Sequence, residues 1–257
     1  MTMPIIALVR PISQSIADCQ LTHLNRQPID LARARRQHAD YVTALTNNGC
    51  QVLKLPQLDD CPDAVFVEDT AIVLPEVAII TRPGAVSRQP ETASMATALQ
   101  QFRTLKHIDQ PAACIDGGDV VVDDKTIYVG LSSRSNHAAI EQLAELTGPF
   151  GYKVKGVALR DCLHLKTAVT RIAPGVFVGN PDWYESSSMP GQHIEVDPQE
   201  PFGANTVELD GVLLRAKEHP ASNQRIADIG GNIVTVAADE LAKAEGAVTC
   251  CSVLIHG

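Results

Sequence analysis

The amino-acid sequence predicts an α/β fold, a closed propeller of five ββαβ units with pseudo-fivefold symmetry. Two observations support this prediction. A short β-rich run with a turn leads to a second apolar run, and in most copies a helix and a further strand follow. No Pro-, Gly- or Ser-rich linker and no low-complexity tract divides the 257 residues, so we expect a single domain over residues 1–257. An open α/β sheet with irregular spacing is the alternative.

The second strand of each unit is the easiest to recognise. Continuous runs of β-branched and other apolar residues, bounded by turn residues, are typical of buried strands. Five such runs recur along the chain, at residues 5–10, 78–82, 127–131, 176–180 and 212–215. Their number predicts five units.

Helices are expected between the second and third strands of most units. They are predicted at residues 30–47, 90–102, 136–147 and 222–229. In the first, apolar residues recur at helical spacing from Leu31 to Leu45, and Gly49 follows just beyond its end. Residues 181–192 are Ser-rich and poorly periodic, so a loop or a short helical turn is expected there.

The first and third strands complete each unit. First strands are predicted at residues 70–74, 120–123, 167–172 and 205–209, and third strands at residues 51–55, 105–108, 152–159, 193–196 and 232–236. The N-terminal unit lacks a first strand of its own. The C-terminal run at residues 251–255 could supply it and close the ring, which would leave few exposed sheet edges.

The composition excludes several classes of function. A formal net charge of −9 without a long basic run argues against nucleic acid and anionic membranes as partners. No apolar run approaches the ~20 residues that span a bilayer. Residues 1–6 lack the basic segment and cleavage site of a secretory signal. Seven cysteines without a C-x-x-C motif predict reduced thiols, a cytoplasmic location and no structural zinc site.

Chemically reactive side chains fall at one position in the units, at or just before the first strand. In chain order they are Glu68, Asp69, Asp116, Asp119, His164, Asn205 and Cys250. If the first strands line the axis of pseudo-symmetry, these groups converge on one pocket. The inference depends on the repeat.

A thiol, an imidazole and several carboxylates suit a cysteine-dependent hydrolase that acts on a cation. A thiol is a weak nucleophile until it becomes a thiolate, and histidine transfers protons near neutral pH. Carboxylates form planar, bidentate hydrogen bonds with guanidinium, and a bound guanidinium would favour a neighbouring thiolate. No metal-ligand set is evident, so we expect neither a metal nor a cofactor.

Each of these residues also has a structural interpretation. A lone cysteine is usually a small buried hydrophobe, and Cys251 is assigned to the core because strand alternation would turn it away from Cys250. Histidines other than His164 are assigned to the surface or core by default. Glu68 and Asp69 could form a solvated turn, but they interrupt an apolar run, where unpaired charge is costly. Their common placement favours the functional interpretation.

Several motifs follow one another through nearly the whole chain. They are PDAVFVED at 62–69, ITRPGA at 80–85 with Ser87 and Arg88, DGGD at 116–119, VGL at 129–131 with RSN at 134–136, LHLK at 163–166 and TCCSVLI at 249–255. In this order they resemble the dimethylarginine dimethylaminohydrolase family of the guanidino-group-modifying (pentein) superfamily. The resemblance implies the superfamily's five-unit α/β propeller, in agreement with the repeat.

The resemblance also implies roles for individual residues. Cys250 matches the nucleophile, His164 the general acid and base, and Asp116 the acidic residue that supports the histidine. Substrate contacts carry over to Leu21, Asp63, Glu68, Asp69, Arg88, Arg134 and Ala244. The arginines suit the α-carboxylate of an amino-acid substrate and the acidic side chains its guanidinium end. Leu21 and Ala244 would contact the α-amino group through their main chains, although Ala244 is smaller than the branched residue usual in the family.

The implied reaction is hydrolysis of Nω-methylated arginines (asymmetric dimethylarginine, monomethylarginine) to citrulline and a methylamine through a covalent thiouronium on the cysteine. Arginine deiminase chemistry on free arginine or another guanidino compound is the alternative within the class, although deiminases and amidinotransferases resemble longer chains. A catalytically silent propeller that binds an arginine-like ligand is the alternative from another class. The expected partner is a small guanidino substrate. A homodimer and inhibition by zinc at the thiol–imidazole pair are left open.

Overall fold

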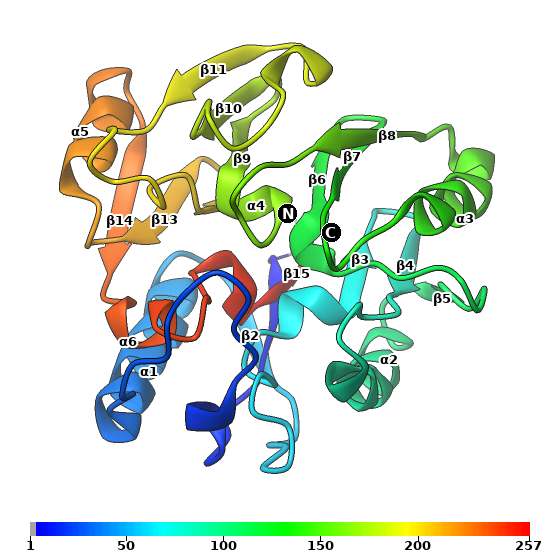
Figure 1. The fold of residues 1–257 in the computed structure, drawn as a ribbon, viewed down its shortest axis with the longest axis horizontal. Coiled ribbons are helices and arrows are strands. Elements are labelled where there is room, and N and C mark those ends of the chain that lie inside the picture. Colours follow the sequence, from blue (N-terminus) through cyan, green and yellow to red (C-terminus); the bar gives the residue numbers. More distant parts are fainter. Residues whose placement is uncertain (1–3) are drawn as a thin grey trace.

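The computed structural model, which describes residues 4–257, contains five three-stranded sheets around a central axis (Figure 1). In every sheet the second strand is central, and it pairs antiparallel with the first strand and parallel with the third. The predicted ring of five ββαβ units is confirmed, and the open-sheet alternative is wrong. Residues 1–3, at which the expectation about a secretory signal begins, lie outside the described residues.

The strands fall close to their predicted positions. The first strands are β15 (Val253–Ile255), β3 (Ala71–Val73), β6 (Val120–Asp123), β9 (Val169–Ala173) and β12 (Thr206–Leu209). The second strands are β1 (Ile6–Val9), β4 (Val77–Ile80), β7 (Thr126–Leu131), β10 (Val176–Gly179) and β13 (Val212–Ala216). The third strands are β2 (Gln51–Lys54), β5 (Thr104–His107), β8 (Lys153–Ala158), β11 (Gln192–Glu195) and β14 (Asn232–Val236).

The two ends of the chain meet in one sheet, as the sequence predicted. Strand β15 pairs antiparallel with β1, which places Ile255 opposite Ile6 and Val253 opposite Leu8. All four of these side chains are at least partly buried. The N-terminal unit is therefore completed by the last strand of the chain.

Helices connect the second and third strands on the outside of the ring (Figure 1). They are α1 (Leu31–Asn47), α2 (Thr92–Leu99), α3 (His137–Thr147) and α5 (Pro220–Asp228), and a short helix α6 (Asp239–Ala242) follows β14. Helix α2 is shorter than predicted because Pro90, which lacks an amide hydrogen, lies in a preceding 3₁₀ segment (Val86–Glu91). The fourth unit has only a 3₁₀ turn (Ser186–Ser188) in its loop, as predicted.

A tight helical turn precedes four of the first strands. The turns are η2 (Val67–Thr70), η4 (Gly117–Asp119), α4 (Leu165–Ala168) and η7 (Thr249–Cys251). They have three or four residues, too few to leave a periodic signal in the sequence. The strands predicted at 167–172 and 251–255 therefore start later than expected. Cys251 is buried, as predicted, but it ends a 3₁₀ turn, so strand alternation was the wrong reason.

The first strands line a central cavity with a volume of about 560 Å³. Apolar side chains such as Val121 and Val207 form much of its wall. At one end it reaches Glu68 and Lys166, whose carboxylate and ammonium groups are 2.6 Å apart.

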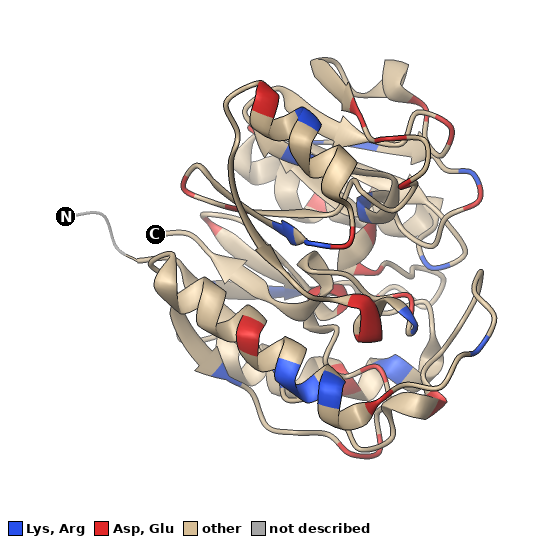
Figure 2. Cartoon of the chain, turned by 90° about the vertical axis from the view of Figure 1, so that its left-hand side faces the viewer, with Lys and Arg blue, Asp and Glu red and all other residues tan. Residues whose placement is uncertain are grey.

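Acidic and basic residues intermingle on the side of the molecule displayed in Figure 2. The chain as a whole carries 30 acidic and 21 basic residues. Within residues 4–257, none of the helices has the length and apolarity needed to cross a membrane.

Candidate active site

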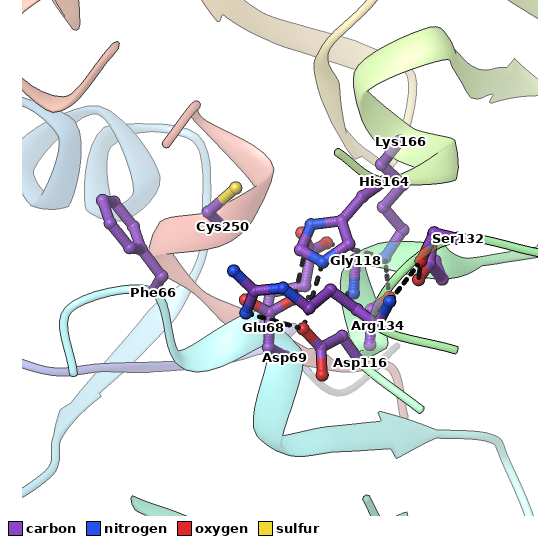
Figure 3. Close-up of polar contacts among 12 residues, drawn as sticks. Phe66, Glu68, Asp69, Asp116, Gly118, Ser132, Arg134, His164, Lys166 and Cys250 are labelled. Carbon is purple, nitrogen blue, oxygen red and sulfur yellow. Dashed lines mark hydrogen bonds and ion pairs between the residues drawn. The ribbon is translucent and has the colours of Figure 1, made fainter. Parts of the chain in front are cut away.

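Most of the predicted reactive residues lie close together, in or beside the tight turns (Figure 3). Glu68 and Asp69 lie in η2, and Cys250 is the middle residue of η7. Asp116 and His164 cap the N-termini of η4 and α4. Four of the five units therefore contribute to one site, whereas the repeat predicted a contribution from all five, with Asn205 from the fifth.

Two glycines allow the turns η2 and η4 to approach each other. A Cβ atom on Gly117 would lie 2.0 Å from the carbonyl oxygen of Glu68. One on Gly118 would lie 2.7 Å from both Asp69 Oδ1 and His164 Nδ1. With no side chain in the way, the amide of Gly118 donates to Asp69 Oδ1 at 2.9 Å. The DGGD motif is thus a close-packed junction.

His164 lies between two carboxylates. Its Nε2 is 3.1 Å from Asp116 Oδ2, and its Nδ1 is 3.9 Å from Asp69 Oδ1. Burial lowers the pKa of His164, but the charges of Asp69 and Asp119 and the hydrogen bond and charge of Asp116 outweigh it and raise the pKa to about 9. The imidazole is therefore protonated at neutral pH and can serve as a general acid.

Among the residues that the structure describes, one group of three has donor atoms close enough together to hold a metal ion. Ligand atoms of Asp69, Asp116 and His164 lie within 4.8 Å of one another. Arg88 already pairs with Asp69, and the amide of Gly84 donates to Asp116 Oδ1 at 2.8 Å. A histidine must be neutral to bind a metal, so the raised pKa of His164 favours a hydrogen-bonded network at neutral pH.

The thiol of Cys250 is partly buried at the edge of this group. Its Sγ accepts a hydrogen bond from the amide of Ala247 at 3.4 Å. Burial and the charges of Glu68 and Asp69 raise the pKa of Cys250 to about 12. The thiol is therefore neutral at neutral pH, and a cation beside it would favour the thiolate.

The other acidic side chains have partners of their own. Glu68 accepts hydrogen bonds from the Lys166 ammonium at 2.6 Å and from the Thr249 hydroxyl at 2.8 Å. Both carboxylate oxygens of Asp63 face the amide of Gln20, at 3.2 and 3.1 Å. Burial is the main cause that raises the pKa values of Glu68 and Asp63. A positive ligand would offset this cost of burial.

The two predicted arginines differ in their surroundings. Arg88 is 4% exposed and donates to Asp69, to both oxygens of Glu91, and to main-chain oxygens that include that of Phe66. The guanidinium of Arg134 has a longer contact with the Thr22 hydroxyl, 3.3 Å, and lies 3.9 Å from Asp116 Oδ2. Arg134 is thus the freer of the two to bind a ligand.

A small cavity with a volume of about 20 Å³ adjoins these groups. It is lined by Gln20, Asp63, Phe66, Asp69, Arg88, Arg134, Leu163, His164, Ala244, Glu245, Gly246 and Cys250. Three predicted site residues are outside this lining: Leu21, Glu68 and Asp116. Leu21 follows Gln20, Glu68 contacts η7, and Asp116 contacts His164. The volume suits about one water molecule, so an amino-acid ligand needs the cavity to widen.

The segment from Gln20 to Leu24 reaches this cavity through Gln20. Glu245 holds it, because its carboxylate accepts hydrogen bonds from the amides of Thr22, His23 and Leu24 at 2.6 to 3.1 Å. Glu245 itself has a positive φ of 56°. Movement of this segment is the direct way to admit a ligand.

The sequence reading missed some residues of the site. Glu245 and Gln20 were not predicted. The only sequence signal for them was their position next to the predicted residues Ala244 and Leu21. Asn205, which was expected to reach the pocket, instead braces η7: it exchanges hydrogen bonds with the hydroxyl and amide of Thr249, at 3.0 and 2.9 Å.

Comparison with known protein sequences gives matches over most of the chain. A family profile described as "N,N dimethylarginine dimethylhydrolase, eukaryotic" matches residues 15–174. The chain is 40% identical over 251 residues to an N(G),N(G)-dimethylarginine dimethylaminohydrolase of Streptomyces coelicolor, covering 97% of this chain and 96% of that protein. It is 30% identical over 254 residues to the protein of the same name from Pseudomonas aeruginosa, covering 95% and 97%.

Solved structures agree with this assignment. A mutant of the dimethylarginine dimethylaminohydrolase (DDAH) from Pseudomonas aeruginosa, complexed with citrulline, superposes on this chain with a TM-score of 0.91 at 28% identity. The match covers 98% of this chain and 100% of that one. The N-terminal domain of ArgZ, an arginine dihydrolase, shares the fold with a TM-score of 0.86 at 19% identity, covering 98% and 97%. The expected pentein propeller is confirmed, and the chain belongs to the dimethylarginine dimethylaminohydrolase family.

Proposed function

We propose that the protein hydrolyses Nω-methylated arginines, asymmetric dimethylarginine and monomethylarginine, to citrulline and a methylamine. One observation carries the proposal. Cys250, whose thiol is neutral at neutral pH, lies beside a buried acidic cluster that includes Glu68 and Asp69 and beside a protonated His164. Such a site binds a guanidinium and uses its charge to generate the nucleophile. The names of the relatives and the citrulline in a related structure support this substrate class.

The first half of the reaction forms a covalent intermediate. Glu68 and Asp69 orient the guanidinium plane, and its positive charge lowers the pKa of Cys250. The thiol proton passes to solvent water, and the thiolate attacks the central guanidino carbon. As the bond from that carbon to the methylated nitrogen breaks, His164 donates its proton to the departing amine. A thiouronium on Cys250 and a neutral His164 remain.

The second half hydrolyses this intermediate. Neutral His164 takes a proton from a water molecule, and the resulting hydroxide attacks the thiouronium carbon. The carbon–sulfur bond breaks as the hydroxyl proton passes to the departing thiolate, which releases citrulline and restores the neutral Cys250 thiol. The proton on His164 is available for the next cycle. Asp116 holds the imidazole in place throughout, through the 3.1 Å contact to Nε2.

The remaining predicted residues hold the amino-acid end of the substrate. Arg134, with its less committed guanidinium, is the stronger candidate for the α-carboxylate. Arg88 is also assigned to that group, although its present contacts make it a support for Asp69. Asp63 and the main chains of Leu21 and Ala244 are assigned to the α-amino group, because Asp63 and Ala244 line the small cavity and Asp63 accepts from the amide of Gln20, next to Leu21.

The experiment is citrulline release from asymmetric dimethylarginine, monomethylarginine and arginine by the purified protein. We expect turnover of both methylated arginines, and a loss of roughly a thousandfold or more in kcat for Cys250→Ser. Cys251→Ser, at the buried neighbouring thiol, is the matched control and should keep near wild-type kcat. Full activity of Cys250→Ser would contradict the mechanism. Preference for free arginine would identify a deiminase, and binding without turnover a silent propeller.

We also propose a cytoplasmic location with no metal or cofactor required. All seven cysteines are free thiols, which suits a reducing compartment. Light scattering of the purified protein distinguishes a monomer from the homodimer left open above. Adding zinc to the activity assay tests inhibition at Cys250 and His164.

A further inference from the structure

A buried carboxylate, that of Asp119, has no place in the reaction described above. Its side chain is fully buried at the end of η4, directly before β6. Oδ2 accepts hydrogen bonds from the hydroxyls of Ser132 and Ser135, both at 2.6 Å, and Oδ1 accepts one from the amide of Leu165 at 3.0 Å. All three partners are donors, which is the environment of a carboxylate anion. Burial is the main cause that raises the pKa of Asp119, to about 6, so it is ionised at neutral pH.

Each serine that donates to Asp119 also accepts a hydrogen bond from the main chain of a site residue. The Ser135 hydroxyl oxygen accepts a hydrogen bond from the amide of Asp116 at 3.1 Å. The Ser132 hydroxyl oxygen accepts one from the amide of Arg134 at 2.9 Å. Because each hydroxyl gives its only proton to Asp119, its oxygen is oriented to accept from these amides.

The third contact of Asp119 reaches the general acid. Leu165 directly follows His164, and its amide is the first of helix α4. Asp119 thereby fixes the backbone from which the imidazole projects. One carboxylate thus connects the main chains at Asp116, Arg134 and His164, which come from different parts of the chain.

Asp119 also adds to the charge around His164. The charged and titratable groups that face the imidazole are Asp69 from η2, Asp116 and Asp119 from the η4 segment, Arg134 after β7, and Cys250 from η7. Asp69 and Asp119 are the two largest Coulombic causes that raise the pKa of His164. Removing the Asp119 charge should therefore make the imidazolium more acidic.

We propose that Asp119 is a positioning residue, which holds His164, Asp116 and Arg134 in register through Leu165, Ser135 and Ser132 and helps to keep His164 protonated for amine departure. The expected effect of Asp119 on kinetics rests on the proposed function. Its expected effect on the protonation of His164 does not depend on any substrate.

The main variant is Asp119→Asn, which keeps the size of the side chain and removes its charge. His164 must be protonated to donate a proton to the departing amine, so activity is present below the pKa of His164 and lost above it. We expect the alkaline limb of kcat/KM against pH to move to lower pH and kcat to fall about tenfold or more. Asp123→Asn, the same substitution at the far end of β6, is the matched control, since Asp123 binds Arg171 and the amide of Gly175.

A direct measurement separates this proposal from the proposed function. NMR titration of isotope-labelled histidine, with His164 assigned by comparison with His164→Gln, gives the midpoint without any substrate. We expect a lower midpoint in Asp119→Asn and an unchanged one in Asp123→Asn. An unchanged His164 midpoint together with unchanged kcat in Asp119→Asn would overturn the proposal, even if the wild type turned over every expected substrate.

Two single-contact variants keep the test decisive if Asp119→Asn does not fold. Ser135→Ala removes the connection to Asp116, and we expect it to lower kcat more than it raises KM. Ser132→Ala removes the connection to Arg134, and we expect it to raise KM more than it lowers kcat. Identical effects of the two variants on kcat and on KM would indicate general loosening and would overturn the assigned roles.

Discussion

Cys250 illustrates how single residues set the chemistry of this site. The acidic neighbours that would attract a guanidinium also oppose ionisation of the thiol, and together with burial they raise its pKa to about 12. Asp69 also stabilises the proton on His164, together with Asp119 and Asp116. The resting site therefore holds a neutral thiol and a protonated acid, so the nucleophile forms only when a cation arrives. This protects the thiol from adventitious oxidation, because the thiolate is the reactive form.

Glu68→Gln should make the Cys250 thiol more reactive toward alkylation but lower the turnover of substrate. Glu68 is the largest Coulombic cause that raises the pKa of Cys250, so its loss should lower that pKa and increase alkylation by neutral iodoacetamide at pH 8 by roughly threefold to tenfold. Turnover should fall because a guanidinium ligand is lost. Glu76→Gln, a carboxylate paired with Lys125 outside the small cavity, is the control. Slower alkylation in Glu68→Gln would contradict the electrostatic account.

At the scale of elements, short turns and one loop determine the site. The turns η2, η4, α4 and η7 precede strands that pack around the axis, so residues distant in the sequence face one another. The segment from Gln20 to Leu24 reaches the cavity through Gln20, and Glu245, Asp63 and Arg134 bind it. A cavity of about 20 Å³ is too small for an amino acid, so we expect this segment to move when substrate binds.

Glu245→Ala should weaken closure of this segment over the substrate. The loss of its hydrogen bonds to three amides costs about 1 kcal/mol or more, so KM should rise roughly fivefold or more while kcat changes less. Trypsin should also cleave faster after Arg26, which lies in the same loop. The control is Glu200→Gln, at a carboxylate that accepts from the amides of Ala221 and Ser222 away from the cavity. An unchanged KM and cleavage rate would show that the segment closes without Glu245.

At the scale of the whole molecule, the ring depends on both ends of the chain. Strand β15 contributes the buried side chains Val253 and Ile255 and pairs with β1. Because η7 directly precedes β15, closure of the ring also positions Cys250. Stability and activity are therefore coupled through the last residues of the chain. The single domain over residues 1–257 stays a prediction, which cooperative unfolding can test.

Deletion of residues 253–257 should open the ring. Exposing the sites of Val253 and Ile255 costs about 1.5–3 kcal/mol for each side chain, and the β1 pairing is lost as well, against a total stability of roughly 5–15 kcal/mol. In urea, followed by circular dichroism, we expect one cooperative transition for the full chain and a strongly lowered or absent one for the deletion. A chain that lacks only residues 256–257 is the control. Wild-type stability of the longer deletion would show that closure is dispensable.

Much of this architecture follows from local patterns in the chain. Runs of β-branched residues specify the strands because side-chain alternation and burial act over a few residues, and the helical periodicity between Leu31 and Leu45 specifies α1 in the same way. Motif order along the chain also predicted roles for Cys250, His164 and Asp116, and these roles stay predictions. The turns η2 and η7 were missed because three or four residues carry no periodicity.

Contacts between distant segments required the folded chain. Glu245 meets Thr22 across 223 positions of sequence, and Asp119 meets Leu165 across 46. The freedom of Arg134 and the full engagement of Arg88 likewise depend on which groups the fold brings beside them. Residue types and local spacing therefore predict which chemistry is available, whereas pKa values, cavity size and positioning contacts depend on long-range packing, because electrostatic and steric effects act through space and not along the chain.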